Sequence, residues 1–151
     1  MSDLGANSFS LDGWLASRGI KKNAEILLRI GLSSSLLSAV ADRFGLWGRP
    51  GAPQVAWGTF SHFLAYAKTL NPWCPPALMP LLGWSATAAE LVLGIALLVG
   101  FRLRWTGLLA ALMTGTFALA MTCVEGVHAP LNYSVFAFST ASFFLAVMSE
   151  R

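Results

Sequence analysis

The chain has 151 residues, of which 56% are hydrophobic and only 11% are charged, whereas a soluble domain of this size carries about 25% charged residues. So few charges cannot cover a water-exposed surface, and the composition therefore predicts an integral membrane protein of one domain. The net charge of +3, with no basic run of five or more residues, argues against nucleic-acid binding. Two cysteines are too few for a disulfide scaffold, and no phosphate-binding glycine motif is present.

The first 25 residues are polar and form a predicted cytoplasmic segment with a short amphipathic helix at about 11–20. They lack the uninterrupted apolar core of a cleavable signal. The rest of the chain, 26–151, is predicted to form the membrane domain. Its first apolar segment, 26–46, is long enough to span a bilayer.

Residues 47–80 differ from the rest, because six of the seven prolines fall there. Within this region, 55–70 has the pattern of an amphipathic helix, with Trp57, Phe60, Leu64 and Ala67 on one face. It is too polar to span, so we expect it to lie in the membrane interface.

Three further segments, 81–101, 105–122 and 130–148, are each about the 20 residues that a membrane-spanning helix needs. The sequence thus predicts an all-α membrane protein, an antiparallel four-transmembrane-helix bundle with an extra interfacial helix between spans one and two.

The positions of Lys and Arg predict that both termini are cytoplasmic, since basic residues concentrate in cytoplasmic connections. With that orientation the inner side holds most of the basic residues, namely Arg18, Lys21, Lys22, Arg29, Arg102, Arg104 and Arg151, and the outer side holds Arg43, Arg49 and Lys68. Arg43, Arg102 and Arg104 are interpreted as residues near span ends that set topology and extend toward water.

Small and polar residues recur at helical spacing in three of the spans, which favours close packing of helices in lipid. We expect the following stripes to be the inner faces of the bundle: Gly31, Ser35, Ser38 and Asp42; Gly83, Thr87, Glu90 and Gly94; Gly107, Ala111, Thr114 and Ala118.

Glu90 lies about halfway along its span, where an ionised group is costly and therefore protonated, paired or facing a wet cavity. Asp42 is near the outer end of the first span, so the two acids, with Ser38 and Thr87, are predicted to line one outward-opening pocket for a ligand or for protons. The alternative is a structural hydrogen bond from a neutral Glu90.

Cys74 and Cys123 both fall on the predicted outer side, where disulfides persist. They either form a disulfide or remain two unpaired thiols; a catalytic dithiol is less favoured, because no CxxC motif is present. Met121, Cys123 and His128 crowd one outer turn and are weak candidates for copper, so no metal site is predicted.

Four segments resemble the DoxX-like family, which includes DoxX, DoxD and MauE proteins. They are LSAVADRFGLWG at 37–48, VAWGTFSHFLAYAKTL at 55–70, AAELVLGIALLVGFRLR at 88–104 and APLNYSVFAF at 129–138. The resemblance implies a small four-helix protein of the bacterial inner membrane that works in redox systems alongside partner proteins.

The leading hypothesis is therefore an accessory subunit of a membrane redox system, whose pocket binds a quinone or relays protons. The alternatives are a binder or transporter of a small ligand, and a purely structural assembly subunit. We do not expect an enzyme that acts alone, because no nucleophile–base pair can be assembled from the sequence. Partners are expected to be the lipid bilayer, other membrane or redox subunits, and further copies of the chain.

Overall fold

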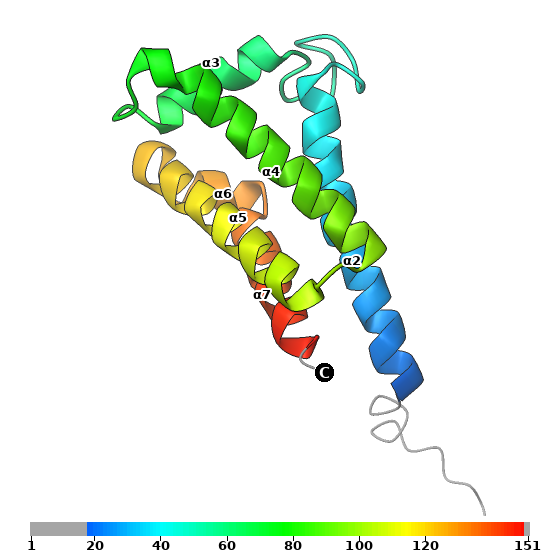
Figure 1. Cartoon of the computed structure of the whole chain (residues 1–151). Coiled ribbons are helices and arrows are strands. Elements are labelled where there is room, and N and C mark those ends of the chain that lie inside the picture. The colour runs from blue at the N-terminus through cyan, green and yellow to red at the C-terminus, as the bar shows by residue number, and fades with distance from the viewer. Residues whose placement is uncertain (1–17, 150–151) are drawn as a thin grey trace, which may run out of the picture.

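In the computed structural model, residues 18–149 are described, and all their regular structure is helical (Figure 1). The expected all-α class is confirmed. The helices are α2 (Arg18–Arg43), α3 (Phe60–Leu70), the short 3-10 helix η1 (Pro76–Leu78), α4 (Met79–Val99), α5 (Leu103–Glu125), α6 (His128–Asn132) and α7 (Val135–Met148). The amphipathic helix expected at about 11–20 lies mostly outside the described residues.

Three of these segments are long and apolar enough to cross a membrane: Arg18–Arg43, Pro76–Val99 and Leu103–Glu125. The segment expected as a fourth span, 130–148, is divided into α6 and α7. Ser134 between them has a left-handed backbone with a φ of 55°, which ends the first helix. The remaining 14 residues of α7 extend about 21 Å, less than the roughly 30 Å of a bilayer core.

Helices α2 and α4 are joined by side chains of α2 that donate hydrogen bonds to backbone carbonyls of α4. Ser33 Oγ donates to Gly94 O (2.8 Å) and Arg29 Nε donates to Leu97 O (3.0 Å). Arg29 thereby gives the Leu97 carbonyl, in the last turn of α4, a second donor beside the backbone amide of Gly100 (3.2 Å). On the same face of α2, Leu32 and Leu36 join the buried apolar core, to which α4, α5 and α7 also contribute.

The predicted inner faces are confirmed for α4 and α5, whose two stripes are buried along their full length. The prediction is wrong for α2, where Gly31, Ser35 and Ser38 are exposed. The buried face of α2 instead carries Leu32, Ser33, Leu36, Val40, Asp42 and Arg43. Because lipid and protein interior are equally apolar, small residues alone did not identify the packed face.

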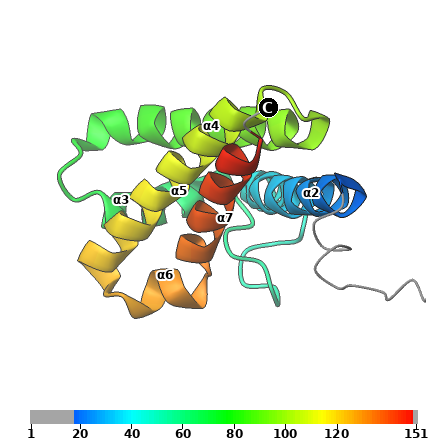
Figure 2. The same ribbon diagram turned by 90° about the horizontal axis from the view of Figure 1, so that it is seen from below.

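Helix α7 packs along α5 and also reaches α2, so that it lies between them (Figure 2). Gly107 of α5 makes this approach possible: a Cβ added there would lie 2.8 Å from the carbonyl oxygen of Ser142 and 3.0 Å from Cβ of Ala146. One turn along α5, Ser139 Oγ of α7 donates to Ala111 O (2.8 Å). The two helices are therefore held by close backbone approach together with an interhelical hydrogen bond.

The helix expected at 55–70 is present as α3 but begins at Phe60, because Thr59 is its N-cap and Gly58 before it has a φ of 66°. Figure 1 shows α3 lying across one end of the long helices. Tyr66 of α3 donates a hydrogen bond to Glu125 at the end of α5 (3.0 Å). Burial, and next this bond to Glu125, raise the pKa of Tyr66 well above its usual range, so the phenol remains a donor at neutral pH.

Substitution of Gly107 tests the close packing of α5 and α7. We expect Gly107→Ala to destabilise the protein by about 1–3 kcal/mol, because the new methyl group meets backbone atoms of α7 that can move only with the whole helix. Gly31→Ala is the matched control, since nothing lies within 4 Å of a Cβ at that position. Thermal unfolding in detergent micelles measures both; equal midpoints for the two variants would contradict the packing described.

Candidate functional site

A buried ion pair joins the last residue of α2 to the middle of α4. Nη2 of Arg43 donates to Oε1 of Glu90 (2.9 Å), and Nη1 of Arg43 lies 2.5 Å from Oε2 of Glu90. Nη1 also donates to Oγ1 of Thr87 (2.8 Å), one turn before Glu90 on the same face of α4. Arg43 and Glu90 are each only 4% exposed, so both charges are withdrawn from solvent and lipid alike.

Helix α3 covers this ion pair. The ring of Phe63 lies flat against Arg43, with the guanidinium carbon 3.7 Å from the ring centroid, a distance at which a cation is attracted to the aromatic face. Phe63 belongs to a second buried cluster with Ala67, Cys74 and Met79. The amphipathic face of α3 thus closes the polar site with aromatic and apolar side chains.

Asp42, the neighbour of Arg43 in sequence, binds a different element. Its Oδ2 accepts hydrogen bonds from the backbone amides of Ala56 (3.1 Å) and Trp57 (2.8 Å). These bonds hold the loop between α2 and α3 against the end of α2. Gly58 follows that contact and must be glycine, because its φ is positive and a Cβ would lie 2.5 Å from the nitrogen of Pro50.

Two buried polar atoms of this site have no hydrogen-bond partner among the described residues: Asp42 Oδ1 and Arg43 Nε. Glu90 Oε2 is in ion-pair contact with Arg43, but it accepts no hydrogen bond of suitable geometry. A buried donor or acceptor without a partner is costly. The site therefore keeps one unused donor, Arg43 Nε, and one unused acceptor, Asp42 Oδ1, within a low-dielectric environment.

The structure brings two of the four predicted pocket residues together. Glu90 and Thr87 meet through Arg43. Asp42 is also buried and precedes Arg43 in the chain, but its Oδ2 binds the loop amides and not Glu90. Ser38 is on the exposed face of α2, where its hydroxyl and carbonyl oxygens accept from the indole nitrogen of Trp47 (3.1 Å each).

Sequence reasoning missed Arg43 as a member of the site. It was interpreted as a residue that sets topology, yet its side chain is buried between helices. A signal was available, because an acid in the middle of a span requires a partner. Of the basic residues, only Arg29 and Arg43 lie within one of the four predicted spans, both in 26–46.

The cysteines are both free thiols, Cys74 buried and Cys123 exposed. Met121 is buried, whereas Cys123 and His128 are exposed. Within residues 18–149, no group of three or more His, Cys, Asp and Glu side chains is arranged to hold a metal ion.

Comparison of the chain with protein-family models, curated proteins and solved structures finds no match in any of the three.

A double-mutant cycle tests how far Arg43 and Glu90 depend on each other. We expect Glu90→Leu and Arg43→Met each to cost about 3–5 kcal/mol of folding free energy, because each leaves one buried charge without its partner. The double variant should regain most of that loss, since neither charge of the pair remains without its partner. Glu125→Gln, which removes an exposed carboxylate, is the control and should change stability by less than about 1 kcal/mol.

Unfolding free energies of the purified chain in micelles measure the cycle. Additive losses in the double variant would show that the two side chains do not act as a pair.

Proposed function

We propose that this chain is an accessory subunit of a membrane redox system, similar to the DoxX-like proteins, and that the site around Arg43 and Glu90 binds a quinone headgroup. The proposal rests on one observation. Beside a buried ion pair, which joins two helices long enough to span a membrane, the polar atoms Arg43 Nε and Asp42 Oδ1 are buried without hydrogen-bond partners among the described residues.

The chemistry of those atoms fits both redox forms of a quinone. Arg43 Nε is a donor that suits a quinone carbonyl, whereas Asp42 Oδ1 is an acceptor that suits a quinol hydroxyl. Reduction of a quinone consumes two electrons and two protons. In this proposal a partner redox protein supplies the electrons, and the two protons come from water, each accepted by the Glu90 carboxylate and then released to the bound quinone.

The surroundings of the site support a ligand of this kind. Phe63 and the cluster around it offer an apolar, aromatic wall next to the polar atoms, and pockets for small organic ligands combine an apolar lining with a few placed polar groups. A quinone headgroup has the same division, with a flat apolar ring between two carbonyls.

In the proposed arrangement the protein lies in a bacterial inner membrane as an antiparallel bundle of four helices. Helices α2, α4 and α5 span the bilayer, and α6 and α7 together form the fourth helical segment of the bundle. The alternating directions of α2 and α4 are supported by their hydrogen bonds, which join Ser33 to Gly94 and Arg43 to Thr87.

Quinone retention tests the proposed function. We expect the wild-type chain, purified in mild detergent, to carry extractable quinone, and we expect Glu90→Gln to lower the molar ratio of quinone to protein at least about tenfold. The Arg43→Met/Glu90→Leu double variant, which should remain folded, should also carry none. Glu125→Gln should retain the wild-type amount, because its carboxylate lies outside the site.

Chromatography of organic extracts and reduced-minus-oxidised ultraviolet spectra measure the quinone. A folded double variant that keeps the wild-type amount of quinone would overturn the site. If wild type carries no quinone but copurifies with a partner chain, the role as a structural assembly subunit is favoured instead.

Membrane orientation is tested with single cysteines at the two ends of the molecule. In a background of Cys74→Ser and Cys123→Ser, Arg49→Cys should react with a maleimide that cannot cross the inner membrane. The cells for this assay have a permeabilised outer membrane and an intact inner membrane. Arg104→Cys should react only after the inner membrane is permeabilised, because Arg104 lies at the end that carries most of the basic residues. The reverse pattern would show that the termini face outward.

A further inference from the structure

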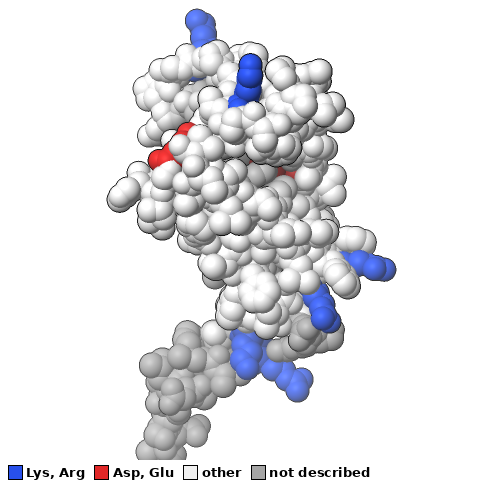
Figure 3. All heavy atoms as spheres, turned by 90° about the vertical axis from the view of Figure 1, so that its left-hand side faces the viewer, with Lys and Arg blue, Asp and Glu red and all other residues white. Residues whose placement is uncertain are grey.

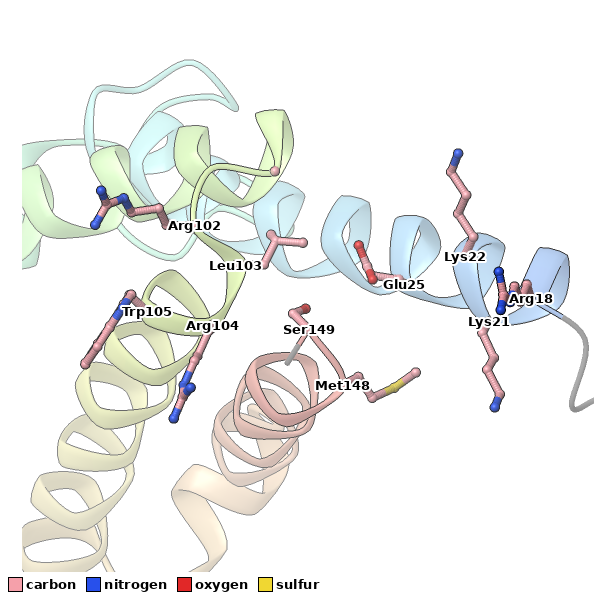
Figure 4. Close-up of a pocket in the computed structure, with 11 residues that line it drawn as sticks. Arg18, Lys21, Lys22, Glu25, Arg102, Leu103, Arg104, Trp105, Met148 and Ser149 are labelled. Carbon is pink, nitrogen blue, oxygen red and sulfur yellow. The ribbon is translucent and has the colours of Figure 1, made fainter. Parts of the chain in front are cut away.

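A large basic cleft lies at the end of the molecule opposite α3. It has a volume of about 1110 Å³ and lies between the first turns of α2, the start of α5 and the end of α7. Figure 4 shows side chains from all three elements around it. Five of the ten Lys and Arg residues of the chain line it: Arg18, Lys21, Lys22, Arg102 and Arg104.

The charge of this cleft is almost entirely positive. Glu25 is its one acidic lining residue within the described part of the chain, and that carboxylate lies 3.9 Å from Arg29, a further basic residue of α2. The lining cations therefore outnumber the carboxylate by a wide margin. Like charges gathered in one place repel each other, so the arrangement suits an anionic occupant.

The cleft also has an apolar side. Leu103, Trp105 and Met148 line it together with the basic residues, and in the view of Figure 4 Met148 lies between Arg104 and Lys21. Trp105 is largely exposed on the first turn of α5, at the end of a membrane-spanning helix, where tryptophan typically marks the level of lipid headgroups. A purely polar anion would make no favourable contact with these apolar side chains.

The position of the cleft matches a membrane surface. It lies where α2 begins, where α4 passes into α5 and where α7 ends, and Figure 1 shows α2 extending beyond the other helices there. On the face shown in Figure 3, Lys and Arg gather at the two ends of the molecule with a largely uncharged band between them. With α2, α4 and α5 placed across a bilayer, this end of the molecule would set the basic side chains at the depth of phosphate groups and the apolar ones at the start of the acyl chains.

We propose that this cleft is a binding site for an anionic phospholipid. Its phosphate groups pair with the basic residues of α2 and of the α4–α5 turn, and its glycerol and upper acyl carbons contact Leu103, Trp105 and Met148. Basic pockets between the ends of membrane helices bind such headgroups. The cleft is much larger than a single phosphate ion, and its volume accommodates a lipid headgroup together with the glycerol.

Titration with defined lipids tests the proposal on the full chain after delipidation in a neutral detergent. Native mass spectrometry counts bound phosphatidylglycerol for wild type, for Lys21→Gln/Lys22→Gln and for Arg102→Gln/Arg104→Gln. Each cleft variant should bind about thirtyfold more weakly, because each removes two charges near the phosphate. Arg49→Gln/Lys68→Gln removes the same charge from exposed positions outside the cleft and should bind as wild type does.

Two further arms identify the occupant. Phosphatidylcholine, which has a phosphate but no net charge, should bind much more weakly than phosphatidylglycerol. Inorganic phosphate at millimolar concentration should not displace the anionic lipid, because it cannot contact the apolar side. Equal binding of both lipids, full displacement by inorganic phosphate, or equal losses in cleft and control variants would each overturn the proposal. Unchanged thermal midpoints confirm that the variants are folded.

Discussion

Arg43 and Glu90 form an ion pair where the end of α2 meets the middle of α4, and neither charge is stable in that position without the other. Because Glu90 holds Arg43 in place, the position at which α2 ends and the following loop begins is fixed relative to α4. Asp42 then fixes the returning loop through the amides of Ala56 and Trp57, and α3 follows to place Phe63 over the guanidinium. The ion pair, the loop and α3 thus depend on one another.

The two polar regions of the molecule differ in chemistry as well as in place. The site around Glu90 is buried, and the charges of Arg43 and Glu90 compensate each other, which suits a small neutral ligand with hydrogen-bonding groups. The cleft at the other end is open and strongly basic, which suits an anion at a membrane surface. Arg29 lies between the two regions and donates to the carbonyls of Leu97 and Leu98 at the end of α4. The packing of α2 on α4 therefore connects the basic end of the molecule to the buried site.

Much of the fold was predictable from the sequence, but the packed face of α2 was not. The stripe of α4 was assigned to the correct face, which carries Glu90, a side chain that cannot face lipid at low cost. The stripe of α5 is buried as well, although its Thr114 satisfies its hydroxyl within its own helix by donating to Ala110 O (2.7 Å). On α2 the exposed Ser35 satisfies its hydroxyl by donating to Gly31 O of its own helix. A serine that bonds within its helix is tolerated by lipid, so its position gave no information about the packed face.

The sequence by itself determined that the chain is helical, that it has segments of membrane-spanning length, and that Glu90 requires a special environment. These conclusions follow from composition, from segment length and from the cost of a charge in a bilayer, none of which depends on how the helices are placed. Only the tertiary structure decided which cation meets Glu90, that Asp42 holds a loop instead, and that basic residues far apart in the chain line one cleft. The reason is that partner choice depends on the rotation and axial position of each helix, and packing between helices sets both.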